Sequence, residues 1–213
     1  MFNRKRAGLF LILVGVILVI AAVMLVMKNL NDNRVAETSS EDVLEKIEQS
    51  RPDPSTTDDG NGLLPDDLVG QVIPDYILNP EMDMPTVEIN GYLYIGTIAF
   101  PALDLELPVM DTWSYPQLNI APCRYSGTAY MDNFVIAAHN YVAHFGRINR
   151  LEIGDSVIFT DMDGNVFRYT VAETDVLSPY AVEEMTSSGY DLTLFTCTLS
   201  GQTRFTLRCN REK

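Results

Sequence analysis

Hydrophobic and polar positions divide the chain into three regions. The first is an unbroken apolar run from Gly8 to Met27, with no charged residue and no proline. At ~1.5 Å per residue, a helix of this length spans ~30 Å, the thickness of the hydrocarbon core of a membrane. No second apolar run of that length occurs in the sequence. The pattern therefore predicts one transmembrane helix over residues 8–27, and a protein that crosses the membrane once.

A basic cluster at residues 4–6 precedes the apolar run. Because positive charge stays on the cytoplasmic side, we expect residues 1–7 in the cytoplasm and everything after Lys28 outside the cell. The alternative is a cleaved signal peptide, whose apolar region usually has only ~7–15 residues before a small-x-small cleavage site. Ala21 and Ala22 are adjacent and lie inside the run, which makes a poor cleavage site and favours an uncleaved anchor.

The second region, residues 28–83, loses the apolar periodicity. Acidic residues greatly outnumber basic ones, and proline recurs throughout. Such a composition buries little apolar surface, so we predict a flexible stalk that holds a domain off the membrane. Glu41 to Gln49 is an exception, because Val43, Leu44 and Ile47 share one face and predict a short helix.

The third region, residues 84–213, is dominated by short or alternating apolar runs. Such runs predict strands, here at Tyr92–Phe100, Leu103–Leu107, Asn133–Ala138, Ser156–Thr160, Val166–Glu173, Leu192–Thr196 and Arg204–Cys209. Helical pieces are expected only near residues 141–150 and 181–185. Many short strands with scattered helical turns predict a mainly β fold, a closed or nearly closed β-barrel. This region is long enough for one domain.

Charge narrows the possible partners. The chain has 29 acidic and 15 basic residues, and its formal net charge is −14. Nucleic-acid binding requires a basic face, so we expect no nucleic-acid partner, and no binding to anionic lipid outside the anchor. Asp161, Asp163 and Gly164 could attract a cation, but a hairpin turn explains them equally well. We therefore predict no metal and no other cofactor.

Candidate chemistry lies in residues 192–209. One predicted strand ends at Cys197, a short polar segment follows, and the next strand opens at Arg204. Two antiparallel strands with a tight connection would place these two residues side by side at one rim of a sheet. A free thiol has a pKa of ~8.5, and a nearby positive charge increases its thiolate fraction. The competing interpretation is a buried cysteine that only fills space.

A histidine could complete such a site, and the chain has only two. His139 directly follows the buried run at residues 133–138, so it should emerge at the end of a strand. His144 is interpreted as a loop residue. Arg208 is a rival to Arg204, because it lies on the same face of the same strand. The other two cysteines, at positions 123 and 209, either form a disulfide or remain reduced and buried.

The stretch Thr193-Leu194-Phe195-Thr196-Cys197, with Arg204 seven residues on, resembles the Thr-Leu-x-Thr-Cys signature of the sortases. Sortases are bacterial cysteine transpeptidases with a β-barrel, and the similarity covers about residues 92–211. The resemblance implies that Cys197 attacks the substrate carbonyl and forms a thioester. It implies that His139 acts as acid and base, and that Arg204 binds substrate and stabilises the oxyanion. Thr196 would contribute to substrate contacts.

The resemblance also implies the substrates. These are Leu-Pro-x-Thr-Gly-like sorting signals of secreted proteins, joined to a peptidoglycan precursor or cross-bridge amine in the Gram-positive cell wall. The expected location is the cell membrane, with a single span, a cytoplasmic N-terminus and an extracytoplasmic catalytic domain. Ala138 is a small departure, because many sortases have glycine before the histidine.

The subclass rests on weaker signals. No membrane segment follows Lys213, and residues 28–83 contain no Asp-Pro-aromatic lid motif, so a pilus-polymerising sortase is not expected. The segment between residues 173 and 192 is short for the long helix of class B enzymes, which favours a general anchoring sortase. Two other functions stay open. One is a membrane-tethered binding domain without activity, and the other is a cysteine L,D-transpeptidase, which would lack this Cys–Arg hairpin spacing.

Overall fold

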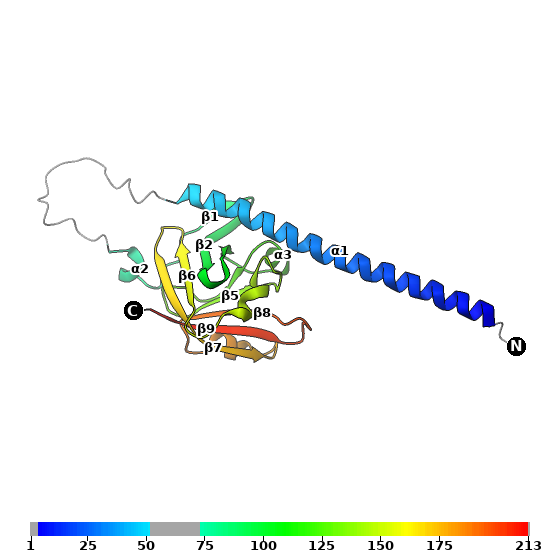
Figure 1. The fold of residues 1–213 in the computed structure, drawn as a ribbon. Coiled ribbons are helices and arrows are strands. Elements are labelled where there is room, and N and C mark those ends of the chain that lie inside the picture. Colours follow the sequence, from blue (N-terminus) through cyan, green and yellow to red (C-terminus); the bar gives the residue numbers. More distant parts are fainter. Residues whose placement is uncertain (1–3, 52–72, 213) are drawn as a thin grey trace, which may run out of the picture.

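The computed structural model describes residues 4–51 and 73–212. Its strands are β1 (Val87–Ile89), β2 (Tyr92–Phe100), β3 (Leu105–Met110), β4 (Cys123–Ser126), β5 (Phe134–Ala138), β6 (Ser156–Asp161), β7 (Val166–Leu177), β8 (Leu192–Cys197) and β9 (Arg204–Arg211). The α-helices are α1 (Arg4–Ser50), α2 (Asp75–Leu78), α3 (Tyr115–Leu118) and α4 (Val182–Thr186), and the short 3₁₀ helices are η2 (Pro101–Leu103) and η3 (Phe145–Arg150). Figure 1 shows α1 extending well beyond the β domain.

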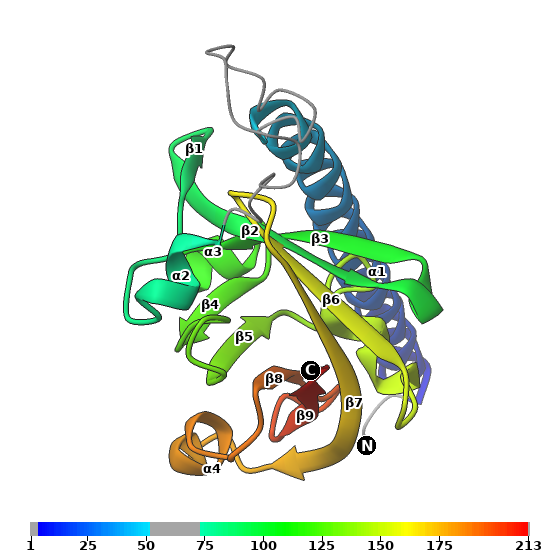
Figure 2. The same ribbon diagram turned by 90° about the vertical axis from the view of Figure 1, so that its left-hand side faces the viewer.

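The strands form one sheet that closes on itself. Its order is β1-β2-β3-β4-β5-β8-β9-β7-β6, and an additional β2–β6 pairing joins the two ends. Eight strands, β2 to β9, therefore make a closed barrel, while β1 adds only to the edge of β2 (Figure 2). Most pairs are antiparallel, but β3 and β4 run parallel, and so do β5 and β8. The predicted mainly β, closed barrel is confirmed.

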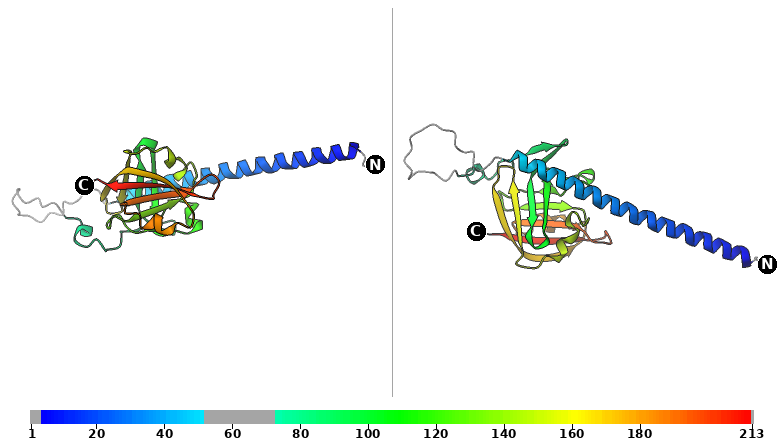
Figure 3. Two further views of the ribbon diagram at one scale, coloured as in Figure 1. Left: turned by 90° about the horizontal axis from the view of Figure 1, so that it is seen from below. Right: turned by 45° about the horizontal axis from the view of Figure 1, so that its top comes forward.

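Alternation along the strands separates two apolar clusters. Leu192 and Leu194 of β8 belong to the cluster that fills the barrel. Phe195, the residue directly after Leu194, belongs to a second cluster that also contains Val43 and Ile47 of α1. Because α1 lies outside the barrel, the second cluster covers the outer face of the sheet (Figure 3). The two-residue period of a strand thus assigns each side chain to the inside or the outside.

Several predicted strand boundaries shift in the structure. The strand predicted over residues 103–107 begins only at Leu105, because residues 101–103 form η2 and Asp104 takes a left-handed conformation with φ of 47°. Strand β7 continues to Leu177, beyond the predicted end at Glu173. Residues 173–177 of β7 pair with β9. Pairing with this distant strand therefore extends β7 beyond the residues whose alternation predicts a strand.

Helix α1 differs most from expectation. The composition predicts a flexible stalk from residue 28, yet the helix runs without a break to Ser50. Residues 52–72 of the predicted stalk lie outside the described residues. Ala36, Val43 and Ile47 are buried on one face of α1, which contacts β1 and β3. Val43 and Ile47, which predicted only a short helix over residues 41–49, pack on the barrel, and their burial stabilises a helix longer than expected.

In the acidic turn between β6 and β7, the Asp161 carboxylate accepts several hydrogen bonds from the protein. Oδ1 of Asp161 accepts hydrogen bonds from the amides of Asp163 and Asn165, at 3.0 and 2.8 Å. Oδ2 accepts one from the hydroxyl of Tyr130 at 2.7 Å. The hairpin-turn interpretation accounts for these residues. Within residues 4–51 and 73–212, no group of three or more histidine, cysteine or acidic residues is arranged to bind a metal ion.

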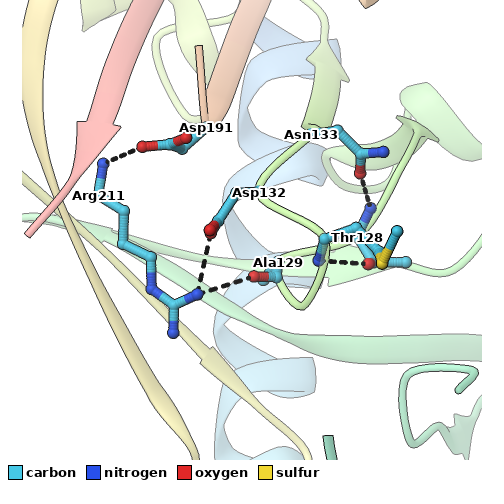
Figure 4. A network of polar contacts seen from close by, with 7 residues as sticks. Thr128, Ala129, Asp132, Asn133, Asp191 and Arg211 are labelled. Atoms are coloured by element: carbon cyan, nitrogen blue, oxygen red, sulfur yellow. Dashed lines mark hydrogen bonds and ion pairs between the residues drawn. The ribbon is translucent and has the colours of Figure 1, made fainter. Parts of the chain in front are cut away.

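Arg211 joins three chain segments at the end of the barrel where β9 finishes. Its Nη1 donates to Asp132 Oδ1 at 2.9 Å and to the carbonyl of Ala129 at 3.5 Å, while its amide donates to Asp191 Oδ2 at 2.7 Å (Figure 4). Asp132 precedes β5 and Asp191 precedes β8. The network therefore ties the starts of β5 and β8 to the end of β9. It lies at the rim opposite the one where β5 and β8 end, and it holds these strands in register.

Candidate active site

Cys197 and Arg204 face each other across one register position. Cys197 is the last residue of β8, Arg204 is the first residue of β9, and the two are directly paired in the antiparallel ladder. Directly opposite residues point to the same face of a sheet, with Cβ atoms about 4.5–5.5 Å apart. The predicted juxtaposition of thiol and guanidinium is therefore present, and the Cys197 side chain is only partly buried.

His139 reaches the same rim by a different route. It follows β5, which runs parallel to β8 in a register that pairs Ala138 with Thr196. His139 directly follows Ala138, and Cys197 directly follows Thr196, so the two side chains come after the same register position. By alternation both point to the outer face, as do Ala137 and Phe195 two residues earlier. Cys197, His139 and Arg204 line one cavity of about 160 Å³.

Aromatic side chains form the walls of this cavity. Trp113 and Tyr115 come from the segment at the start of α3, Tyr125 from β4, and Phe195 from β8. Tyr125 links the others, with its ring centroid 5.3 Å from Trp113 and 5.1 Å from Phe195. The thiol therefore borders a pocket with aromatic walls.

A second cavity of about 380 Å³ adjoins Cys197 from another direction. It is lined by the loop after β8, from Thr198 to Ser200, together with Asn140, Asn149 and Phe205 among others. Cys197 and Thr196 line both cavities. The thiol consequently has space for one reactant on each side.

Burial sets the protonation of both histidines. Desolvation lowers the pKa of His139 below its ordinary value, so the neutral imidazole predominates at neutral pH. His144 is fully buried, and desolvation lowers its pKa to about 4. Its Nε2 lies 3.2 Å from the carbonyl of Ile120, so this nitrogen carries the proton. The loop-residue interpretation of His144 agrees with this place, because its ring does not line the cavity of Cys197.

The two rival arginines have different surroundings. Nη1 of Arg204 donates to the carbonyls of Gly201 and Thr203, both at 3.2 Å, which fixes the guanidinium beside the cavity. Arg208 is buried, lies 3.8 Å from the Asp175 carboxylate and stacks over the Tyr190 ring. The geometry favours Arg204 as the site residue and gives Arg208 a packing role.

Thr196 points into the barrel mouth, away from the outer face. It is 5% exposed, and its hydroxyl has no hydrogen-bond partner among the described residues. Thr196 lines both cavities beside Cys197.

The remaining cysteines lie on opposite sides of the sheet. Cys123 belongs to the outer cluster and Cys209 to the barrel interior, so the sheet itself separates them. Burial raises the pKa of each thiol to about 12. Both are therefore unreactive space-filling residues, and no disulfide joins them.

Sequence reasoning missed the residues that shape the site. The aromatic lining comes from three segments separated in the chain, and only Phe195 offered a signal, two residues before the thiol on the same face. β4, which carries Tyr125, was not predicted because it has only four residues, and one of them is arginine.

A closed barrel with a thiol, an imidazole and a guanidinium at one rim is the arrangement that the resemblance to the sortases predicts. A family model described as a Sortase domain matches residues 98–212, more than half of the chain. The chain therefore belongs to the sortase family, and the resemblance found in the sequence is confirmed. A search of curated proteins gives no match.

Solved structures agree with this assignment. Sortase C of Streptococcus pneumoniae is 25% identical, with a TM-score of 0.52 over 59% of this chain and 69% of that one. Sortase C1 of Streptococcus suis is 24% identical, with a TM-score of 0.50 over 56% and 73%. A sortase D5 transpeptidase of Clostridium perfringens is 18% identical, with a TM-score of 0.54 over 84% and 99%. The last two show a shared fold.

Proposed function

We propose that this protein is a membrane-anchored sortase that cleaves a Leu-Pro-x-Thr-Gly-like sorting signal and transfers the secreted protein to a cell-wall amine. One observation carries the proposal. Cys197 is in register with Arg204 and one strand away from His139, at a partly exposed rim of a sortase-family barrel.

In the first half of the reaction, Cys197 Sγ attacks the carbonyl carbon of the threonine in the signal. Neutral His139 accepts the thiol proton, because its lowered pKa keeps a nitrogen lone pair available at neutral pH. The resulting imidazolium donates that proton to the leaving amine as the peptide bond breaks. The threonine carbonyl is then held in a thioester, and Arg204 stabilises the oxyanion of the intermediate that precedes it.

In the second half, an amine attacks the thioester carbon. The amine gives a proton to His139, the carbon–sulfur bond breaks, and the proton returns to the sulfur as the new amide forms. The cavity bounded by residues 198–200 supports this step, because it reaches Cys197 beside the aromatic pocket. The energy of the first peptide bond is retained in the thioester, so no nucleotide is needed.

The membrane topology is part of the proposal. Among the described residues, α1 is long and apolar enough to cross a membrane near its N-terminal end. We place residues 1–7 in the cytoplasm and the barrel outside, because of the basic cluster at residues 4–6. In Figure 1, β9 runs away from the N-terminal part of α1. The start of β9, with Arg204, therefore faces the membrane end of the helix.

We further propose that the enzyme anchors proteins to the cell wall and does not polymerise pilins. The sequence support is that residues 28–83 contain no Asp-Pro-aromatic motif. The pneumococcal and S. suis structures, both sortases C, share the fold with this chain. An acceptor competition distinguishes the subclasses. An anchoring enzyme prefers an oligoglycine or a peptidoglycan stem amine, whereas a polymerising enzyme prefers the lysine amine of a pilin.

The proposed activity is tested on the full chain in detergent micelles. A fluorogenic Leu-Pro-x-Thr-Gly peptide and an amine acceptor are incubated with wild type, Cys197→Ala and His139→Ala. We expect Cys197→Ala to abolish turnover and His139→Ala to lower kcat about 10²–10⁴-fold, the range for loss of a general acid–base group. Hydroxylamine should release a hydroxamate from the wild type and none from Cys197→Ala, because it traps the thioester.

Far-ultraviolet circular dichroism and thermal unfolding control for folding of both variants. Cleavage that survives Cys197→Ala would contradict the proposal. A wild type that binds sorting peptides without cleaving any of them would support the tethered binding domain, and cleavage of peptidoglycan stem peptides alone would support an L,D-transpeptidase.

A further inference from the structure

Helix α1 reaches from the predicted membrane segment to the loop that carries His139. Its C-terminal half packs on β1 and β3 through buried residues from Ala36 to Ile47. Arg51, just past the helix, donates to Thr97 Oγ1 on β2 at 2.9 Å. One turn before the buried stripe, Asn33 Oδ1 accepts a hydrogen bond from the amide of Ala143 at 3.1 Å. The helix therefore touches both the wall of the barrel and a loop at its rim.

The loop after His139 is a tight turn whose inner hydrogen bonds converge on two carbonyls. The amide of Phe145 donates to the carbonyl of His139 at 3.1 Å, and the amides of His144 and Gly146 donate to that of Tyr141 at 2.9 and 2.8 Å. The His139 and Tyr141 rings lie 5.0 Å apart, and those of Tyr141 and His144 lie 5.6 Å apart. A displacement of the turn would therefore move the His139 ring as well.

The amide of Ala143 takes no part in these hydrogen bonds and donates to α1 instead. Beside the contact lies a cavity of about 340 Å³ between the helix and the barrel, lined by Asn33, Val142 and Arg147 among others. Close packing therefore does not fix the loop against the helix. The hydrogen bond from Ala143 to Asn33 is a specific link across an otherwise loosely filled gap.

We propose that Asn33 is a positioning residue, which holds the loop of His139 so that the imidazole is set against Cys197. The anchor helix then acts as a part of the active site in addition to its role as a tether. This inference rests on the proposed transpeptidase function for its kinetic consequence, while its effect on the Cys197 thiol is independent of any substrate.

The test compares Asn33→Ala with two variants of the full chain in detergent micelles. Asn33→Asp keeps an acceptor oxygen at the same place, and Asn31→Ala removes an exposed amide two residues away on the same helix. We expect Asn33→Ala to lower kcat about 5-fold, the effect of one neutral hydrogen bond, with KM changed less than about 2-fold. Asn33→Asp and Asn31→Ala should stay within about 2-fold of wild type in both.

Alkylation of Cys197 by iodoacetamide gives a readout that needs no sorting peptide. The other two cysteines are buried, so only this thiol should react. In Asn33→Ala, alkylation at pH 7 should slow, because a displaced His139 accepts the thiol proton less well. Amide exchange of the segment at residues 139–146 should also accelerate in this variant alone.

The outcomes separate the two proposals. A wild type that cleaves no sorting peptide, with alkylation that slows in Asn33→Ala, would overturn the transpeptidase proposal and support the positioning role. An active wild type whose kcat and alkylation rate match those of Asn33→Ala would overturn the positioning role. A defect in Asn33→Asp as large as in Asn33→Ala would also contradict it, because the acceptor is then irrelevant.

Discussion

At the residue scale, the candidate site contains one positively charged side chain, and the choice lies between Arg204 and Arg208. The guanidinium of Arg204 is fixed by two loop carbonyls beside the cavity, whereas Arg208 is engaged with Asp175 and Tyr190. A guanidinium offers a planar fork of donors that matches a carbonyl oxygen and its neighbours, while an ammonium is a point charge. The two arginines lie on one strand and one face, which makes them a matched pair.

We predict that Arg204→Lys lowers kcat/KM for a sorting peptide at least about 10-fold, the scale of a lost charge-assisted hydrogen bond in the transition state. Arg208→Lys should leave turnover within about 2-fold of wild type, since Arg208 does not line the cavity. Steady-state kinetics on both variants, with thermal unfolding as the folding control, test this. Equal losses in the two variants would remove Arg204 from the site.

At the element scale, barrel closure requires a close approach of β2 and β6. Gly96 of β2 pairs with Asp161, and a Cβ atom built on it would lie 2.1 Å from the carbonyl oxygen of Thr160. Glycine is required there because any larger residue would push the two strands apart. This pairing converts an open sheet into the barrel that places β5, β8 and β9 at one rim.

We predict that Gly96→Ala lowers the free energy of unfolding by about 3 kcal/mol, from overpacking and backbone strain together. Gly164→Ala is the control. Gly164 has a φ of +83°, with no atom within 4 Å of the added methyl group, so it should cost only about 1 kcal/mol. Urea unfolding followed by the fluorescence of Trp113, the single tryptophan, gives both values. Equal losses would mean that the approach to Thr160 is unimportant.

At the scale of the whole molecule, the domain extends beyond the barrel. Val43 and Ile47 of α1 complete the outer cluster with Ile89, Tyr94 and Met110. A chain that begins at residue 84 would expose this surface and lose the Arg51–Thr97 hydrogen bond. The part of α1 after the predicted membrane segment therefore packs against the barrel and covers part of its outer face.

We predict that a chain beginning at residue 29 is more stable than one beginning at residue 84, by about 3 kcal/mol. Burial of each large aliphatic side chain contributes about 1.5–3 kcal/mol, and the cost of ordering the helix offsets part of it. The urea midpoints of the two soluble chains measure the difference. Coincident midpoints would show that α1 adds nothing to the domain.

The sequence by itself determined the features that depend on neighbours in the chain. The apolar run from Gly8 to Met27, the alternating strands and the Cys197–Arg204 hairpin each involve residues close together, whose spacing directly reflects helix or strand geometry. The closed barrel could be predicted because many short strands leave few other ways to bury their apolar faces.

Only the tertiary structure decided which distant segments meet. The parallel pairing of β5 with β8 brings His139 to Cys197, and the burial of Ile47 turns part of a predicted stalk into a docked helix. The aromatic pocket likewise draws on Trp113, Tyr125 and Phe195 from separate strands and turns. Local periodicity does not indicate which distant segments pair, because long-range pairing depends on the burial that the whole barrel achieves.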